Sequence, residues 1–275
     1  MMDRDRAVEL HYTQDELVEK VLAAIRRVKG GLEGLSVRDL APVDGFHVRG
    51  RAATEELAAL AGVLPGWRVL DVGCGVGGSA RFLADRCGCR VLGVDLTPAY
   101  VDLASTLSAL VGLEESCRFQ VASATELPCG DAEFDCVWLE HVQMNIANKA
   151  GLVSELSRVL RVGGRLALHE VFLGSGGPPR LPVPWAETLD TSFLTAYEDL
   201  RDLLTAGGFH LVEERDVTET SLQWFRKQRD RAPAPPNPLG LHLLMGPRAK
   251  EKVANLSLNL EENRVRIVQL VVEKS

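Results

Sequence analysis

A run of apolar residues that breaks abruptly into glycines constrains this chain more than any other stretch. Residues 69–78 read VLDVGCGVGG, and a helical pattern, SARFLA, follows at 79–84. Glycine is favoured where the backbone takes a positive φ or where a ligand approaches the main chain, and a helix start leaves free N–H groups at its positive end. The stretch therefore predicts a buried strand, a tight turn and a helix N-terminus that bind a polar, nucleotide-like ligand.

The next apolar run, over 90–94, ends in Asp95, which stands 20 residues after Gly75 (95 − 75). In a doubly wound fold, an acid at this place reaches the hydroxyl groups of a ribose. The glycines at 73, 75 and 78 also fit the pattern G-x-G-x-x-G, which is typical of dinucleotide binding. An NAD-dependent oxidoreductase is therefore one alternative.

Asp71 lies inside the first predicted strand, two residues before Gly73. An unpaired carboxylate in such a strand is costly unless it meets a hydrogen-bond donor or a cation. A ligand that carries an ammonium group would explain this residue.

A set of motifs resembles those of class I S-adenosylmethionine-dependent methyltransferases. The first two are DVGCGVG at 71–77 and Asp95 at the end of the next strand. The later ones are SATELP at 123–128, FDCVW at 134–138 and VLRVGGRL at 159–166. By motif spacing the resemblance covers roughly residues 40–215. Within the family, EHVQMNI at 140–146 is similar to the small-molecule sarcosine/dimethylglycine and ubiquinone/menaquinone methyltransferase group.

The resemblance implies an α/β fold that is doubly wound and Rossmann-like, with a helical cap. Its seven-stranded, mostly parallel sheet would have the order 3-2-1-4-5-7-6, with the last strand antiparallel. We expect an N-terminal helical lid segment at 1–62 and a methyltransferase domain at 63–275, with a cap insertion at about 218–262.

The resemblance also implies that the cofactor is S-adenosyl-L-methionine, which leaves as S-adenosyl-L-homocysteine. At Ser123 the chain departs from the acid that many family members carry there to contact the adenine amino group. The expected cofactor contacts are Asp71, Gly73, Gly75, Gly77, Asp95, Leu96, Ser123, Ala124 and Glu140.

Methyl transfer needs an acceptor atom aligned with the methyl carbon and the departing sulfur, and it needs water to be excluded. A neutral amine can attack directly, whereas a hydroxyl or an acidic carbon needs a base. Candidate catalytic residues are His141, Glu170 and Glu140, and His141 comes first because it follows the fourth strand. Alternatively, a hydrogen bond from the backbone or Asn145 gives His141 a structural role. His169 and Glu170 alternate along one strand, so at most one of them contacts the substrate.

Three residues are expected against the acceptor: Tyr12, Gln143 and Trp185. Tyr12 belongs, with His11 and the segment 46–51, to the expected lid, and Trp185 follows a loop rich in glycine and proline at 174–184. An ordinary surface helix and an exposed loop are the alternatives.

Periodicity and capping residues predict the other elements. Thr54 is expected to cap a helix over 55–61, and Thr97 one that starts at Pro98. A proline-rich run at 232–238 interrupts the expected cap. In this cap, Leu241, Leu243, Leu244 and Met245 either form an apolar wall of the acceptor pocket or pack as part of an ordinary helical appendage. Further helices are predicted over 13–28, 148–160 (stopped by Gly163 and Gly164) and 197–206, and strands over 118–121, 134–139, 165–171, 209–217 and 265–272.

Composition favours a small molecule as the partner, and the resemblance implies that this molecule is the methyl acceptor. The net charge of −7, without a long basic run, argues against nucleic acid, and no apolar stretch approaches the length of a membrane span. The charged start MMDRDR is unlike a signal peptide, so a cytoplasmic location is expected. Six cysteines without C-x-x-C spacing predict free thiols and no metal site. A cyclase or a non-methylating binding protein with the same fold stays open, as do the acceptor atom and the oligomeric state.

Overall fold

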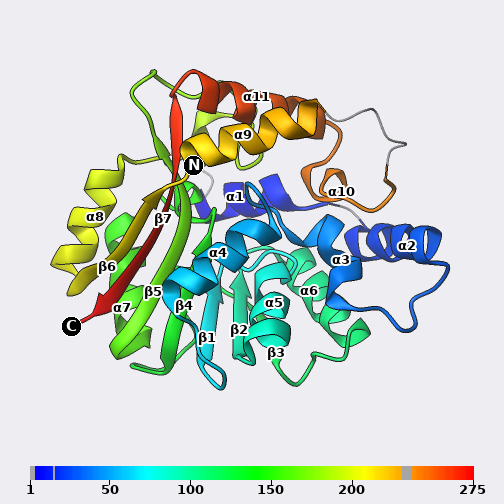
Figure 1. Cartoon of the computed structure of the whole chain (residues 1–275), viewed down its shortest axis with the longest axis horizontal. Coiled ribbons are helices and arrows are strands. Elements are labelled where there is room, and N and C mark those ends of the chain that lie inside the picture. Colours follow the sequence, from blue (N-terminus) through cyan, green and yellow to red (C-terminus); the bar gives the residue numbers. More distant parts are fainter. Residues whose placement is uncertain (1–3, 15, 231–236) are drawn as a thin grey trace.

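The computed structural model describes residues 4–14, 16–230 and 237–275. Most of the proline-rich run at 232–238 and the first three residues of the charged start lie outside these ranges. Figure 1 shows a central sheet with helices packed on it and a further group of helices above one edge. The strand order is β3-β2-β1-β4-β5-β7-β6, and β7 runs antiparallel to both of its neighbours. The predicted topology is therefore confirmed.

The seven strands follow the predicted runs, with β5 and β7 longer than expected. They are β1 (Arg68–Val72), β2 (Arg90–Asp95), β3 (Cys117–Val121), β4 (Phe134–Glu140), β5 (Leu160–Leu173), β6 (Phe209–Asp216) and β7 (Val265–Lys274).

Helices alternate with the first strands and then cluster in the N-terminal and late segments. They are α1 (Arg4–Tyr12), α2 (Leu17–Lys29), α3 (Val37–Asp44), α4 (Arg51–Ala61), α5 (Gly78–Cys87), α6 (Pro98–Leu110), α7 (Lys149–Val159), α8 (Tyr197–Ala206), α9 (Thr218–Arg229), α10 (His242–Met245) and α11 (Ala249–Glu261), with short 3-10 turns η1 (Gln143–Asn145) and η2 (Leu189–Thr191).

Strand β1 lies between β2 and β4 and is buried on both faces of the sheet. Val69, Leu70 and Val72 are inaccessible to solvent, as parallel strands covered by helices require. Asp71, the polar exception, pairs in register with Gly93 of β2 and Trp138 of β4. The carboxyl ends of these three strands therefore meet at one edge of the sheet.

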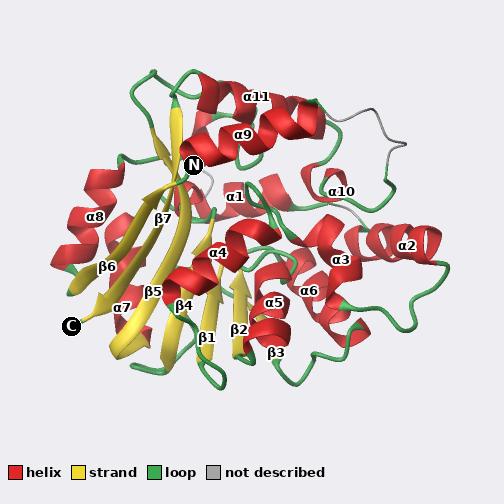
Figure 2. Cartoon of the chain, viewed as in Figure 1, coloured by secondary structure: helices red, strands yellow, loops and turns green. Residues whose placement is uncertain are grey.

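The two faces of the sheet have separate hydrophobic cores. On one face α7 and α8 contribute Leu156 and Leu200 to a core that includes Phe172 of β5. On the other, α4 and α5 contribute Leu57 and Leu83 to a core around Trp138. Figure 2 shows these helices on the two sides of the strands. This sandwich holds the carboxyl edge rigidly.

Three predicted helix boundaries are wrong. The helix expected over 13–28 is α2, which begins at Leu17 after α1 has ended at Tyr12. Thr54 does not cap α4, since that helix begins at Arg51 and Thr54 lies inside it. Helix α7 is not stopped by the glycine pair, because the chain passes directly into β5 at Leu160 and Gly163 and Gly164 lie in that strand.

The late helices cover the carboxyl edge from above. Leu222 of α9 and Leu256 of α11 pack against Val265 and Ile267 at the start of β7. The predicted apolar wall of α10 is displaced: Leu244 packs with Leu17 and Val21 of α2, and none of the four wall residues lines the main cavity. In the described part of the chain, no helix has the length and apolar character that crossing a membrane requires.

Candidate active site

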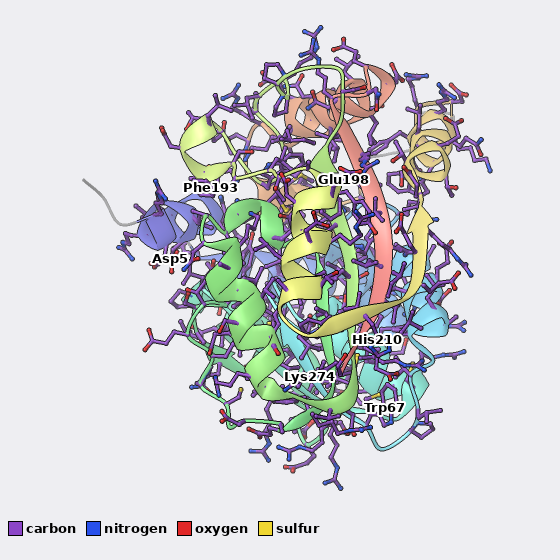
Figure 3. All side chains as sticks on the ribbon, turned by 90° about the vertical axis from the view of Figure 1, so that its left-hand side faces the viewer. Asp5, Trp67, Phe193, Glu198, His210 and Lys274 are labelled. Carbon is purple, nitrogen blue, oxygen red and sulfur yellow. The ribbon has the colours of Figure 1, made fainter. Side chains whose placement is uncertain are left out.

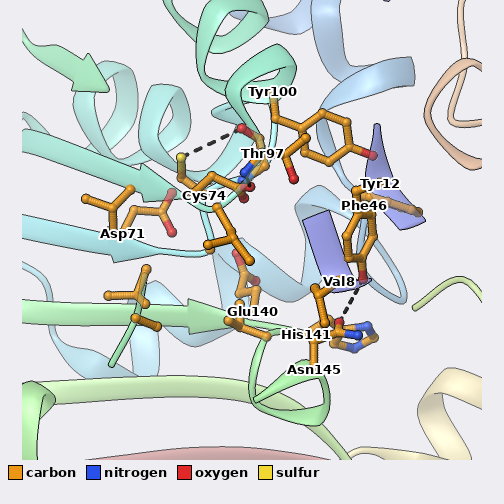
Figure 4. A pocket seen from close by; sticks show the side chains of 18 of the residues that line it. Val8, Tyr12, Phe46, Asp71, Cys74, Thr97, Tyr100, Glu140, His141 and Asn145 are labelled. Atoms are coloured by element: carbon orange, nitrogen blue, oxygen red, sulfur yellow. Dashed lines mark hydrogen bonds between the residues drawn. The ribbon is translucent and has the colours of Figure 1, made fainter. Parts of the chain in front are cut away.

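A cavity of about 1200 Å³, counted up to its open mouth, lies where β1, β2 and β4 end. This is the place where an open α/β sheet binds ligands, because the connections leaving neighbouring strands diverge there. Figure 4 shows Asp71 and Cys74 on one side of it, Val8, Tyr12 and Phe46 on the other, and Glu140 between them. The sequence-predicted residues that line it are Tyr12, Asp71, Gly73, Gly75, Asp95, Leu96, Ser123, Ala124, Glu140, His141 and Trp185.

The glycine turn adopts the backbone that its sequence predicts. Gly73 has a φ of 69°, and a Cβ there would lie 2.5 Å from a methyl group of Val142. Gly75 has a φ of 52°, and the position of its absent side chain is open space within 4 Å. A ligand can therefore approach the main chain at Gly75.

Asp95 is held rigidly at the cavity wall. The backbone N–H of Gly75 donates to Oδ2 at 2.9 Å, and the N–H of Thr97 donates to Oδ1 at 2.9 Å. Burial raises the pKa of this carboxyl, while the two backbone donors oppose the shift. Each carboxylate oxygen has a second lone pair for a ligand hydroxyl.

Asp71 is buried, and its Oδ2 has no hydrogen-bond partner among the described residues. Burial raises the pKa of this carboxyl well above its usual range, and the charges of Glu140 and Asp95 raise it further. Glu140, in contrast, accepts hydrogen bonds from Thr54, Ser79 and the Trp138 indole. Asp71 is thus the carboxylate at this edge that lacks a partner for one oxygen.

His141 stands at the end of β4 with a left-handed φ of 58°. Its backbone N–H donates to the carbonyl of His169 at 2.9 Å, and the two rings stack with centroids 5.0 Å apart. Burial lowers the pKa of His141 well below its usual value, and nearby His169 and His47 lower it further. Its Nε2 is buried without a partner in the described structure, so a neutral ring at the cavity has a nitrogen free to accept a proton.

Asn145 does not restrain His141. The Tyr12 hydroxyl donates to its Oδ1 at 2.8 Å, and its Nδ2 donates to the carbonyls of Trp185 (2.9 Å) and Thr191 (2.8 Å). Asn145 therefore joins α1 to the loop after β5 across the cavity. Trp185 itself is buried, and its indole donates to Ser192 at 3.0 Å.

Helix α1 also crosses the cavity at two further points. Ser123 donates to Asp5 at 3.0 Å, and the His11 ring bonds the carbonyl of Pro184 at 3.1 Å. Arg4 lies over the Phe193 ring, 5.6 Å from its centroid. Figure 3 shows Asp5 and Phe193 close to each other on this side of the molecule. The N-terminal helix thus forms one wall of the cavity.

Three predicted site residues do not line the cavity. Glu170 is wholly buried, and its carboxylate accepts the backbone N–H groups of Val142 (3.0 Å) and Gln143 (3.3 Å). The Gln143 amide donates to the carbonyl of Val171 at 2.6 Å. Gly77 faces packing atoms, because a Cβ there would lie 2.8 Å from Phe119. His169 and Glu170 point to opposite faces of β5, as strand alternation requires, and neither of them lines the cavity.

Several lining residues were missed by sequence reasoning. Val8 lies on α1, whose short segment has no strong apolar period, and Asp44 and Tyr100 reach the cavity only through the packing of α3 and α6. Ser79 could have been found, because it is the second residue of the helix after the glycine turn. The residues missed are Asp5, Val8, Asp44, Val72, Cys74, Val76, Ser79, Val94, Thr97, Tyr100, Ala122, Thr125, Val142, Met144, Asn145, Ile146 and Pro184.

Comparison with known proteins identifies the family and the fold. Residues 70–168, which run from β1 through most of β5, match the family model of a methyltransferase domain. The chain belongs to the class I S-adenosylmethionine-dependent methyltransferases. The cofactor of this family is S-adenosylmethionine.

Three curated relatives of this protein are themselves methyltransferases by name. It is 32% identical over 185 residues to methyltransferase GfsG of Streptomyces halstedii, covering 66% of each chain. It is 29% identical over 204 residues to erythromycin 3''-O-methyltransferase of Saccharopolyspora erythraea, covering 68% of this chain and 67% of that one. Tocopherol O-methyltransferase of Arabidopsis thaliana is 41% identical over 101 residues, 37% of this chain and 29% of that one. The chain thus spans just under two thirds of GfsG and under a third of the tocopherol enzyme.

Solved structures share the whole fold at low sequence identity. Geranyl diphosphate C-methyltransferase of Streptomyces coelicolor A3(2), bound to S-adenosyl-L-homocysteine, superposes with a TM-score of 0.74 and 18% identity over 100% of this chain and 99% of that one. The [4+2]-cyclase SpnF superposes with a TM-score of 0.67 and 20% identity over 99% and 97% of the two chains. These likenesses establish the architecture of the methyltransferase.

Proposed function

We propose that this methyltransferase transfers the methyl group of S-adenosylmethionine to a hydroxyl oxygen of a small, largely apolar molecule. The observation that carries the proposal is the pair of unpartnered buried atoms at the cavity, Asp71 Oδ2 and His141 Nε2. The first calls for a cation and the second for a proton donor. Several relatives are O-methyltransferases by name, among them an erythromycin and a tocopherol enzyme.

The carboxylates at the glycine turn support a cationic cofactor. S-adenosylmethionine carries an ammonium group that Asp71 can accept and ribose hydroxyls that can donate to Asp95. A dinucleotide would bring two phosphates to a wall on which Asp71, Asp95 and Glu140 already stand. Anions in that position are repelled, so the charge pattern favours S-adenosylmethionine over NAD.

The base of the cofactor is assigned to the wall beyond Asp95. Leu96, Ser123 and Ala124 line the cavity there, and they combine two apolar surfaces with one hydroxyl. The Ser123 hydroxyl donates to Asp5 at 3.0 Å and accepts from the hydroxyl (3.0 Å) and the backbone N–H (3.4 Å) of Thr125. It therefore fixes this wall against α1, and an adenine amino group would have to displace one of these contacts to bind it.

The reaction consists of one methyl transfer from sulfur to oxygen and one proton transfer from the acceptor hydroxyl. The acceptor oxygen attacks the methyl carbon, the carbon–sulfur bond breaks, and its electron pair stays on sulfur as S-adenosylhomocysteine forms. The hydroxyl proton passes to His141 Nε2, which the low pKa of this ring keeps unprotonated at neutral pH. Alignment of the reactants can lower the barrier by roughly 7–11 kcal/mol in well-oriented systems.

The acceptor is assigned to the side of the cavity formed by Val8, Tyr12, Phe46, Met144 and Trp185. These side chains are apolar or aromatic and exclude water from the sulfonium. We propose the same division of the chain that the sequence predicts. Residues 1–62 act as a lid, and residues 218–262 act as a cap on the methyltransferase domain at 63–275. Contacts of α1 with Ser123, Asn145 and Pro184 support the lid.

Calorimetric titration with S-adenosylhomocysteine tests the cofactor assignment. We expect binding by the wild-type protein, at least a tenfold weaker affinity for Asp95→Ala, and no binding of NAD in parallel. NAD binding without S-adenosylhomocysteine binding would refute the proposal.

Transfer of a labelled methyl group tests the acceptor class. A panel of phenols and alcohols is compared with amines of matching carbon skeleton, using wild-type protein and His141→Ala. We expect the wild-type protein to form labelled methyl ethers from phenols or alcohols, and His141→Ala to form none. Binding of S-adenosylhomocysteine with no methylated product from any acceptor would instead favour a non-methylating protein, such as a cyclase.

A further inference from the structure

Arg81, on the first turn of α5, is wholly buried beneath the glycine turn and does not line the cavity. One guanidinium nitrogen, Nη2, donates to the carbonyl of Val76 at 2.8 Å and to Asp44 Oδ1 at 2.5 Å. The other, Nη1, donates to the carbonyl of Ala104 at 3.3 Å and to Ser108 Oγ at 3.2 Å. A single side chain therefore joins the glycine turn, the end of α3 and the middle of α6.

The contact between α3 and α5 is too close for ordinary side chains. A Cβ at Gly78 would lie 2.3 Å from the carbonyl oxygen of Asp44, and a Cβ at Gly77 would lie 2.9 Å from Arg81 Nη1. The end of α3 thus rests directly on the first residue of α5. Because Asp44, Phe46 and His47 line the cavity, the position of this contact sets the position of one cavity wall.

Arg81 also restricts the conformation of the turn. The peptide unit that carries the Val76 carbonyl lies between Gly75 and Gly77, both of which have positive φ values of 52° and 80°. Glycines give such a segment several accessible conformations, so the fixed direction of this carbonyl requires a strong partner. The buried guanidinium is that partner, and Asp44 balances its charge.

We propose that Arg81 is a positioning residue for cofactor binding, which acts by fixing the glycine turn and seating the end of α3 on it without touching the ligand. This inference rests on the proposed cofactor site. It predicts that the affinity for S-adenosylhomocysteine depends on a side chain outside the cavity, and that Asp44 acts partly through the same contact.

The test compares S-adenosylhomocysteine affinity, measured by calorimetry, among wild type, Arg81→Met, Arg81→Lys and Asp44→Asn. We expect Arg81→Met to bind at least tenfold more weakly. Arg81→Lys should recover part of the loss, because an ammonium is a single charged point that cannot reach all four acceptors. The double variant Arg81→Met/Asp44→Asn should bind more weakly than Arg81→Met by a smaller factor than Asp44→Asn costs in the wild-type background, since the two changes share the Arg81–Asp44 contact.

Arg158→Met is the matched control. Arg158 also joins several elements, through the carbonyls of Leu127 (3.1 Å) and Cys129 (2.7 Å) and the carboxylates of Asp131 (2.9 Å) and Glu155 (2.7 Å), but it lies away from the cavity. This variant should unfold at a lower temperature and keep its affinity within twofold. The thermal shift on adding S-adenosylhomocysteine should shrink for Arg81→Met and stay unchanged for Arg158→Met.

Two results would overturn different claims. If wild-type protein fails to bind S-adenosylhomocysteine, the proposed function fails. If wild type binds and folded Arg81→Met binds within twofold of it, the role of Arg81 fails while the function stands. Should Arg81→Met not fold, unchanged affinity in both Arg81→Lys and Asp44→Asn would equally refute the role.

Discussion

Asp71 is a residue at which stability and binding oppose each other. Its unpartnered, buried Oδ2 is costly to the ligand-free protein, and burial raises the pKa of the carboxyl well above its usual range. A ligand ammonium would remove that cost. Residues of this kind are found where a protein is built for a ligand rather than for its own stability.

We therefore predict opposite effects from Asp71→Asn. Without ligand, the variant should unfold at the same or a higher temperature than wild type. With S-adenosylhomocysteine, its thermal shift should be much smaller, because the neutral amide cannot balance the ammonium. Asp71 has a folded pKa above its unfolded pKa, so its ionisation destabilises the protein as the pH rises through that interval.

The stability advantage of Asp71→Asn over wild type should therefore grow as the pH is raised from 4 towards 8. Thermal unfolding followed by circular dichroism measures it at each pH. An advantage that shrinks with rising pH would contradict this account of Asp71.

The segment between β4 and α7 is an element held by two side chains, the buried Glu170 and the partly buried Lys149. Glu170 accepts two of its backbone N–H groups, and Lys149 donates to the carbonyls of Gln143, Ile146 and Phe193. Burial raises the pKa of Glu170 to about 8 and lowers that of Lys149 to about 8. Glu170 is accordingly a support for the turn that presents His141, not the base that its residue type indicated.

Glu170→Ala should loosen this segment without removing the cofactor site. Each buried N–H left without a partner costs about 1–3 kcal/mol, and the loss is partly offset because a buried carboxylate disappears. We expect faster amide hydrogen exchange at residues 142–146 and S-adenosylhomocysteine affinity within threefold of wild type. Glu170→Gln, which keeps one acceptor oxygen, serves as the control with an intermediate rate. Unchanged exchange in the alanine variant would refute this role.

At the scale of the whole molecule, three histidines from distant parts of the chain meet beside the cavity. The ring centroid of His47 lies 5.7 Å from that of His169 and 6.1 Å from that of His141. Glu140 faces His47 at 3.5 Å, and His169 bonds the carbonyl of Val48 at 3.1 Å. The segment after α3, the end of β4 and the middle of β5 are thus packed through imidazole rings.

This cluster should make the protein sensitive to acid. Burial lowers the pKa of His169 well below its usual value, so between that value and the lower folded pKa the unfolded state binds more protons. Stability is then lost as the pH falls below about 6.5, by up to about 1.4 kcal/mol per unit for this group. His169→Gln, whose amide can still donate to Val48, should lose less stability than wild type between pH 7 and 5. Equal losses measured by urea unfolding would contradict this expectation.

Local patterns in the sequence were sufficient for the sheet and for one half of the site. Buried parallel strands read as apolar runs, and glycines mark a turn whose backbone other residues avoid, so β1, the turn and Asp95 could be placed from the sequence alone. Strand alternation likewise separated His169 from Glu170. These features depend on neighbours within a few positions along the chain.

The other half of the site was decided by packing between distant segments. Helix α1 has no strong apolar period, yet its Tyr12 meets Asn145, and Asp44 meets Arg81 only because α3 rests on α5. Glu170, a catalytic candidate by residue type, faces the backbone of Val142 instead of the cavity. The sequence by itself determined which strands and which turn this protein would have, because those follow from local hydrophobicity and allowed φ values. Only the tertiary structure decided which side chains reach the cavity, because that depends on how helices far apart in the chain pack together.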